Sequence, residues 1–210
     1  RVAIAVGLLT QVLILAIGVP IGAVAALVGG RVDNLLMRLT DFVYAFPDLL
    51  LIILLSAALR EHPIRSLGGG LVVIFIAIGI CNWVGIARLT RGQMLSLKER
   101  EYVEAARALG ARNSHIVLRH LLPNALGPIL VSVTFGIPSA IFTEATLSFL
   151  GLGIIPPNPS WGSMIQEGYQ AIFAYPHLVL FPTLAIATTL MAFTFLGDGL
   201  RDALDPLSNT

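Results

Sequence analysis

Residues Lys98–Pro123 read KEREYVEAARALGARNSHIVLRHLLP, and they form the one long polar stretch in a chain of 210 residues that is otherwise mostly apolar. Seven of the 13 Lys and Arg residues lie between Arg88 and Arg119. The apolar runs on either side are long enough to cross a bilayer. A basic, alanine-rich insert between two membrane spans is typical of a cytoplasmic loop that binds another protein.

The first half of this loop is predicted to be an amphipathic helix. Its apolar residues recur at the i, i+3, i+4 and i+7 positions of one helix face, namely Tyr102, Ala105, Ala106 and Leu109. The small alanines on this face would let another protein approach the helix backbone closely, although a helix resting on lipid headgroups has the same pattern. Gly110 follows where a helix commonly ends, because glycine adopts the left-handed conformation at low cost.

The second half of the loop is predicted to be another short helix. Asn113 and Ser114 are residue types that cap a helix N-terminus, and we expect this helix to reach His120. Pro123 then marks the start of the next apolar segment. The loop at 98–123 is therefore expected to be a helix-turn-helix on the cytoplasmic surface.

The composition places the whole chain in a membrane. Hydrophobic residues make up 56% of it and charged residues only 12%, whereas soluble domains carry about 25% charged residues. The length suits a single domain covering residues 1–210. The one cysteine, Cys81, lies in an apolar run and is expected to be a buried structural thiol.

The apolar segments predict an all-α membrane protein with about five spans. Their approximate ranges are 2–28, 39–59, 67–89, 126–147 and 178–196. Residues 31–38 are expected to be a polar connection, and the fourth span is interrupted by Pro128, Gly136 and Pro138. After Glu144 the chain is expected to form an external loop at 151–176, which contains a short interfacial helix at Trp161–Tyr169.

Three acidic residues lie in or near the predicted spans, where an ionisable group costs about 2.5–3.5 kcal/mol and therefore needs a reason. Asp41 is expected near the interface or paired with Arg31 or Arg38. Asp48 and Glu144 are candidates for a transport pathway or its outer gate. Gln11, in the first span, faces either such a pathway or a neighbouring helix to which it hydrogen-bonds.

The basic residues orient the chain. Placing the loop at 98–123 inside the cell makes the connection at 31–38 and the C-terminal tail cytoplasmic as well. The N-terminus and the loops at 60–65 and 151–176 are then external. Five spans with an external N-terminus suggest that a first transmembrane helix precedes this sequence, which does not begin with Met.

The polar loop resembles a known motif. Glu104, Ala105 and Ala106, then Gly110, then Leu122 and Pro123 are spaced as in the EAA loop of ABC-importer permeases. The sequence His120-Leu-Leu-Pro-Asn124 is similar to the H-x-L-P-N form of this loop in the peptide and nickel branch, where the general pattern has Ile in place of His120.

The resemblance covers essentially the whole chain. The segments MRLTDFVYAFPDLLLIILL, TEATLSFLGLG and FLGDGLRDALDP are similar to the dipeptide, oligopeptide and nickel permeases, and specifically to their C-type subunit. Such subunits usually have six spans. The expected function is therefore that of a permease subunit forming half of the pore for dipeptides or oligopeptides.

The resemblance also implies partners and residue roles. A second homologous permease, cytoplasmic ABC ATPase subunits and an external solute-binding protein are expected, in a bacterial inner membrane and without nucleic acid. Glu104 would contact the ATPase, Ala105 and Ala106 would permit close packing, Gly110 would set the turn, and Leu122 and Pro123 complete the motif. No G-x-x-x-x-G-K-[ST] phosphate loop occurs here, so no cofactor or enzymatic activity is expected in this chain, and ATP would be used by the partner.

Three alternatives stay open from sequence. A nickel or metal-chelate importer shares the loop, although the spans lack a His- or Cys-rich cluster and no metal site is expected. A stand-alone channel would leave the loop unexplained. An intramembrane enzyme based on Asp41 and Asp48 is disfavoured, because seven residues on one helix separate them by about 10.5 Å along the axis, and neither H-E-x-x-H nor G-x-S-x-G occurs.

Overall fold

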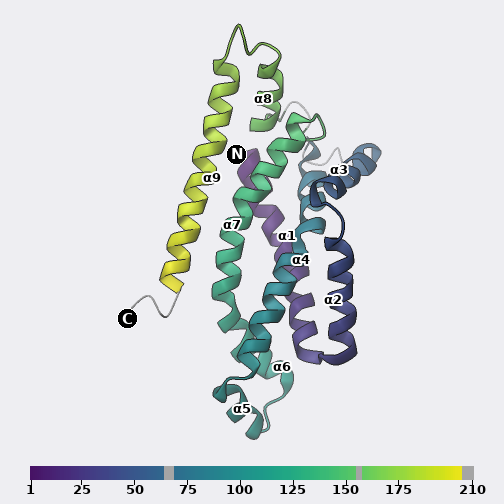
Figure 1. Ribbon diagram of the computed structural model, residues 1–210, viewed down its shortest axis with the longest axis vertical. Helices are drawn as coiled ribbons and strands as arrows, with labels where there is room; N and C mark the ends of the chain where they lie inside the picture. Colours follow the sequence, from purple (N-terminus) through teal and green to yellow (C-terminus); the bar gives the residue numbers. More distant parts are fainter. Residues whose placement is uncertain (64–68, 155–157, 205–210) are drawn as a thin grey trace.

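The computed structural model describes residues 1–63, 69–154 and 158–204, and every regular element in these ranges is a helix (Figure 1). The helices are α1 (Val2–Val28), α2 (Gly30–Tyr44), α3 (Asp48–Ala58), α4 (Leu71–Lys98), α5 (Glu101–Ala108), α6 (Asn113–Ile116), α7 (Leu122–Phe149), α8 (Trp161–Tyr169) and α9 (His177–Leu204), with a 3-10 turn at Leu59–Glu61 and a π-helical turn at Val117–Leu121. The predicted start of the third span at 67–68, part of the loop at 60–65, Pro156, Pro157 and the tail beyond Leu204 lie outside the described residues.

Four helical segments are long and apolar enough to cross a membrane: α1, α4, α6 continued into α7, and α9. The bent pair α2–α3 makes a fifth candidate. This confirms the predicted all-α class with about five spans. The predicted span at 39–59 is not one continuous helix, because α2 and α3 meet at an angle of 82°. Pro47 lies at the bend, and proline disfavours helical conformation in the residue before it.

The remaining predicted segments differ from the structure mainly at their ends. Residues 31–38 are helical and belong to α2, so the predicted connection there was wrong. Helix α7 runs without interruption through Pro128 and Pro138, and Glu144 lies within it. Helix α8 has the predicted bounds, and Ser160 caps it by accepting a hydrogen bond from the Ser163 N–H at 3.2 Å.

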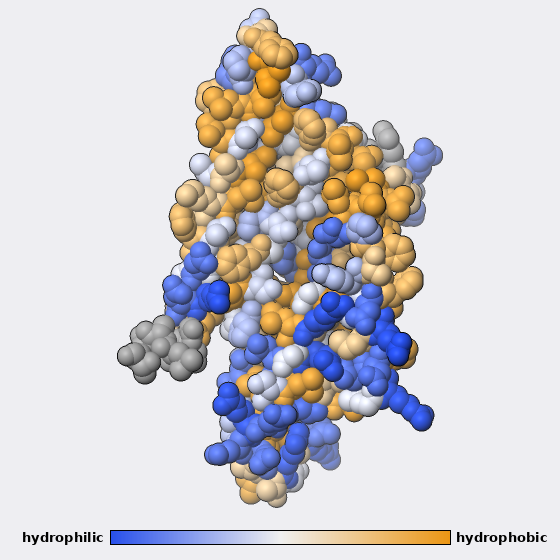
Figure 2. Space-filling view, in the orientation of Figure 1, coloured by the Kyte–Doolittle hydropathy of each residue, from blue (hydrophilic) through white to orange (hydrophobic). Residues whose placement is uncertain are grey.

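The long helices α1, α2, α4, α7 and α9 run roughly along the long axis of the molecule (Figure 1). Helices α5 and α6 lie at one end, near the turn between α1 and α2. Helix α8 lies at the opposite end, together with the N-terminus and α3. In Figure 2 hydrophilic surface gathers at the α5–α6 end, and hydrophobic surface covers much of the flank formed by α9 and the region around α3. Exposed hydrophobic surface of this extent is stable in contact with lipid, whereas its exposure to water would be unfavourable.

Close packing of α1 against α4 forms the centre of the bundle. Gly18 and Gly22 are spaced as G-x-x-x-G and face the α4 backbone: an added Cβ would lie 2.8 Å from the Trp83 carbonyl oxygen at Gly18 and 2.3 Å from the Ala87 carbonyl oxygen at Gly22. Small residues at this spacing let two membrane helices approach closely. The glycines thus fix the position of α4, which leads directly into the polar loop.

Charged groups fasten α1 and α2 to the same half of α4. Arg91 donates to both carboxylate oxygens of Asp33 on α2, at 2.5 and 2.6 Å. Lys98 donates to the Ala26 carbonyl near the end of α1 at 2.5 Å. Asp41 pairs with Arg88 at 2.7 Å, so the predicted pairing with Arg31 or Arg38 was wrong. The true partner is 47 residues away and is brought close by helix packing.

Candidate functional site

The first half of the polar loop is the short helix α5, which is anchored to the helix bundle by a buried side chain. Val103 of α5 is 0% exposed and packs in a cluster with Ala26, Met94, Ile116, Val117 and Leu121. Ala106 is half-buried against the same cluster. Glu101 and Glu104 lie in the first turn of α5, where negative charge is favoured by the helix dipole. The anchor fixes which face of α5 is turned outward.

Helix α5 ends in a turn that needs glycine. Gly110 has a φ of 81°, in the left-handed region that glycine adopts most readily. Its N–H donates to the Arg107 carbonyl at 2.9 Å, and the Ala111 N–H donates to the Ala106 carbonyl at 3.0 Å. These two bonds make a Schellman motif, which satisfies the last carbonyls of the helix. The sequence-based prediction of a helix end at Gly110 is confirmed.

The exposed face of α5 carries apolar side chains. Leu109 is 89% exposed and Tyr102 is 41% exposed, and Ala105 and Glu104 are also exposed. The predicted apolar face grouped Tyr102, Ala105 and Leu109 with Ala106, but only Ala106 is turned toward the bundle. The stripe through Val103 is the one that packs inward.

The second half of the loop joins α7 without a break. Helix α6 begins at Asn113 with no side-chain capping bond, and it continues through the π-helical turn into α7. The predicted cap by Asn113 or Ser114 and the predicted end at His120 were therefore wrong. Pro123 lies in the first turn of α7, and the wide π turn ends two residues earlier at Leu121; proline has no N–H to donate.

His120 links the two halves of the loop. Its ring lies 6.1 Å from that of Tyr102 and 6.0 Å from that of His115, measured between centroids. A hollow of about 480 Å³ beside it is lined by Ser114, His115, Leu118 and Arg119. Of the last two motif residues, Leu122 is half-buried against the Val103 cluster and Pro123 is exposed. The loop thus presents an outer surface, which is made of exposed side chains: Tyr102, Glu104, Ala105, Leu109 and Leu118.

Asp48, one pathway candidate, lies at the bend between α2 and α3. It is exposed, and its Oδ1 accepts a hydrogen bond from the Leu49 N–H at 2.7 Å. It also lines a cavity of about 550 Å³ between this bend and α4, together with Tyr44, Leu51, Asn82 and Gly85 among others. The structure therefore brings Asp48 to an open space rather than burying it in a helix contact.

Glu144, the other pathway candidate, is enclosed by protein. It is 0% exposed, and its Oε1 accepts a hydrogen bond from the Ser148 hydroxyl at 2.6 Å. The Ser148 oxygen in turn accepts the Ile154 N–H at 3.3 Å. Glu144 lines none of the cavities described here and instead holds the turn after α7 against that helix.

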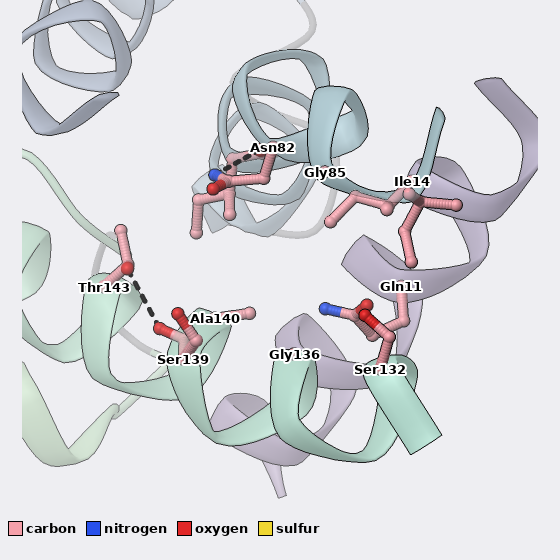
Figure 3. A pocket seen from close by; sticks show the side chains of 11 residues that line it. Gln11, Ile14, Asn82, Gly85, Ser132, Gly136, Ser139, Ala140 and Thr143 are labelled. Carbon is pink, nitrogen blue, oxygen red and sulfur yellow. Dashed lines mark hydrogen bonds between the residues drawn. The ribbon is translucent and has the colours of Figure 1, made fainter. Parts of the chain in front are cut away.

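A second, smaller cavity was not predicted from sequence. It lies between α1, α4 and α7, has a volume of about 140 Å³, and shares Asn82 and Gly85 with the larger cavity. Figure 3 shows the side chains of Gln11, Asn82, Ser139 and Thr143 around it. The sequence does contain a signal for this cavity, because small and polar residues recur at helical spacing along one face of α7, namely Ser132, Gly136, Ser139 and Thr143.

These features define a class of protein. A bundle of membrane helices with open polar cavities within it and an anchored polar loop at one end has the architecture of a membrane transport subunit. The family described as binding-protein-dependent transport system inner membrane component matches residues 18–209. The chain belongs to this family, and it is accordingly a multi-pass inner-membrane component.

Relatives in the family agree along nearly the whole chain. It is 46% identical over 206 residues to the oligopeptide transport system permease protein OppC of Bacillus subtilis and 42% identical over 207 residues to the dipeptide transport system permease protein DppC of the same organism, each time with 98% of the chain matched. The glutathione transport system permease protein GsiD of Pectobacterium atrosepticum is 40% identical over 206 residues, again 98% of the chain. These matches cover 65%, 62% and 66% of the relatives' own lengths, so the chain spans just under two thirds of each. The predicted resemblance to the dipeptide and oligopeptide permeases is confirmed.

A solved structure supports the fold. A chain of the inward-facing MetNI methionine ABC transporter superposes with a TM-score of 0.75, covering 97% of this chain and 93% of that one. The sequence identity is 18%, so the likeness concerns the helix arrangement alone.

Proposed function

We propose that this chain is the permease subunit of an ATP-driven importer for dipeptides or oligopeptides. It forms half of the pore and couples to a separate ATPase through the loop at 98–123. Support comes from the family, from relatives whose names specify oligopeptide and dipeptide transport, and from the motif Glu104-Ala105-Ala106 with Gly110, Leu122 and Pro123.

One observation carries the coupling role. Leu109 is a large apolar side chain with 89% of its surface exposed, and it lies on a polar, charged loop rather than in the apolar belt. Val103 and the Gly110 turn hold the backbone beneath it in one position. Ala105 adds a place where a partner can approach the helix closely. A fixed, partly apolar surface with Glu104 beside it fits a groove on another protein.

The proposal assigns sides and partners. The α5–α6 end and the C-terminus are cytoplasmic, and the segment 151–176 with α8 is external, as the basic residues favour. The partners are a second homologous permease, cytoplasmic ATPase subunits that bind the ATP, and an external solute-binding protein. Glu144 holds the external turn, while Asp48 faces the pathway.

A nickel or metal-chelate importer of the same family is the alternative. Among the described residues no three His, Cys, Asp or Glu side chains are grouped closely enough to hold a metal ion. No structural observation favours this alternative, and uptake measurements with peptide and with nickel separate the two.

The test is co-purification of the full-length protein from its native membrane in mild detergent. The variants are Glu104→Arg and Leu109→Glu on the outer surface of the loop, which under this proposal is the coupling surface. The control is Glu167→Arg, the same charge reversal at an exposed site of α8 at the opposite end. We expect the wild type and the control to retain both an ATPase and a second permease, and the two variants to retain only the second permease.

Reconstitution of the complex with its binding protein then measures transport. ATP-dependent peptide uptake by the wild type supports the importer. An ATPase that never co-purifies, or uptake that does not depend on ATP, would refute it in favour of a stand-alone channel. If both variants hold the ATPase as well as the wild type does, the coupling surface lies elsewhere.

A further inference from the structure

The smaller cavity lies at one level of the bundle. Gln11 is 17 residues from the end of α1 at Val28, Asn82 is 16 from the end of α4 at Lys98, and Ser139 is 17 from the start of α7 at Leu122. At 1.5 Å per residue each side chain is about 24–26 Å from the coupling-loop end of its helix. The opposite ends of the same helices are about 14–17 Å away. Three helices thus place polar groups at a common depth inside the membrane.

The Gln11 amide has no partner at this depth. Gln11 is 5% exposed, and it makes no hydrogen bond with any residue that the structure describes. Its amide points into the cavity in Figure 3. Asn82 uses its N–H to bind the Ile78 carbonyl at 2.9 Å, which leaves its own oxygen able to accept. The Gln11 amide lies against Gly136 of α7 and borders the open cavity, so its hydrogen-bonding groups and the Asn82 oxygen are available to water or to a ligand that enters.

The chemistry of the lining selects the kind of ligand. The cavity is bordered by Gln11, Asn82, Ser132, Ser139 and Thr143 among small and aliphatic residues, and no charged side chain lines it. A carboxamide offers one donor and one acceptor to a peptide bond, which presents the complementary pair. A charged ligand would find no counter-charge here and would pay a large desolvation cost.

The adjoining cavity completes the space that a peptide needs. It has a volume of about 550 Å³, is lined by apolar and aromatic side chains together with Asp48, and meets the smaller cavity at Asn82 and Gly85. Side chains of varied size would fit there while the backbone stays on the polar wall. The smaller, uncharged cavity would therefore bind the peptide backbone, and the larger adjoining cavity would accommodate its side chains.

We propose that Gln11 and Asn82 form a half-site for the backbone amides of a peptide in transit, the facing half being supplied by the second permease. This rests on the proposed importer function. It assigns the substrate's amide backbone, rather than its side chains, as the group that this subunit binds within the membrane. Peptides of different sequence are then accepted through the one feature that they share.

The first experiment uses the reconstituted complex and a peptide series in which each amide in turn is replaced by an ester, which lacks the N–H. Uptake is measured with binding protein saturated by each analogue. In the wild type, we expect at least one ester to be transported about fivefold more slowly than the parent peptide, because the loss of one hydrogen bond has an effect of about this size. In Gln11→Leu that difference should vanish, whereas the matched Gln93→Leu variant on α4 should keep it. A purely structural role for Gln11 would not remove the difference between amide and ester.

A second variant pair tests the site without touching Gln11. A Cβ added at Gly85 or at Gly92 meets nothing within 4 Å, so a leucine at either position of α4 begins in open space. Gly85 borders both cavities and Gly92 borders neither. We expect Gly85→Leu to lower peptide uptake at least tenfold with the ATPase still bound, and Gly92→Leu to transport normally.

The outcomes separate the two proposals. Equal rates for all esters in the wild type, an ester effect that survives in Gln11→Leu, or normal uptake by Gly85→Leu would each overturn the amide half-site while leaving an importer. Absence of ATP-dependent uptake by the wild-type complex would instead overturn the importer and, with it, the half-site.

Discussion

Replacing Gly22 by alanine should loosen the contact between α1 and α4. The new Cβ would lie 2.3 Å from the Ala87 carbonyl oxygen, 2.8 Å from the Thr90 Cβ and 3.0 Å from the Arg91 backbone nitrogen. Two of these atoms belong to the helix backbone and cannot turn aside. A carbon and a carbonyl oxygen approach to about 3.3 Å, so the two helices must separate locally by about 1 Å.

The cost follows from this overlap. Overpacking of a tight contact costs about 1–3 kcal/mol, and for a chain of this size each kcal/mol lowers the melting temperature by about 2–4 °C. Alanine also favours helix over glycine by about 1 kcal/mol, which partly masks the effect. Gly92→Ala on α4 gains the same helix preference, and its Cβ meets nothing within 4 Å. The difference between the two variants therefore isolates the clash at about 2–12 °C.

The assay heats the full-length protein in detergent and measures the fraction that still elutes as a folded species. Gly22→Ala should melt below Gly92→Ala by the stated margin. If the two variants melt within 1 °C of each other, α1 and α4 are not in the close contact described, and the reasoning from Gly18 and Gly22 fails.

Three further predictions concern individual contacts. Arg91→Ala should destabilise the protein by about 1–3 kcal/mol, and in a thermal double-mutant cycle Asp33→Ala should add little to it; additive losses would show that the two residues do not interact. Glu144→Leu leaves the Ser148 hydroxyl without its acceptor and should cost about 1–3 kcal/mol in the same melting assay, whereas Glu144→Gln keeps an acceptor and should cost less; equal losses would contradict this assignment. At Gly110, ATPase retention on co-purification should fall in the order Gly, Asn, Val, because asparagine tolerates positive φ and a β-branched residue does not; retention of the ATPase by the valine variant would count against a required turn.

The sequence predicts the elements that depend on local chemistry. Length and apolarity place α1 at its observed bounds, and the predicted interfacial helix at Trp161–Tyr169 has the bounds of α8. Gly110 predicts the end of α5. The bend between α2 and α3 was missed because hydropathy is continuous across it, although Phe46-Pro47 is a signal for a break.

Features that depend on packing could not be predicted in this way. Periodicity finds an apolar stripe on α5, but it does not say that Val103 rather than Leu109 is the side chain turned inward. Asp41 has basic neighbours in sequence, yet its partner Arg88 lies on another helix. Gln11 was ambiguous for the same reason: whether an amide meets a helix or a cavity depends on the positions of three helices at once.

Helix α4 is one unbroken rod from Asn82 to Lys98, and this makes it a lever arm between the cavity and the coupling loop. A rod of about 24 Å turned by about 10° around the cavity carries its far end by about 4 Å. Arg91 and Lys98 bind α2 and α1 near the loop end of α4, so a rotation of α4 would carry the adjoining ends of these two helices with it.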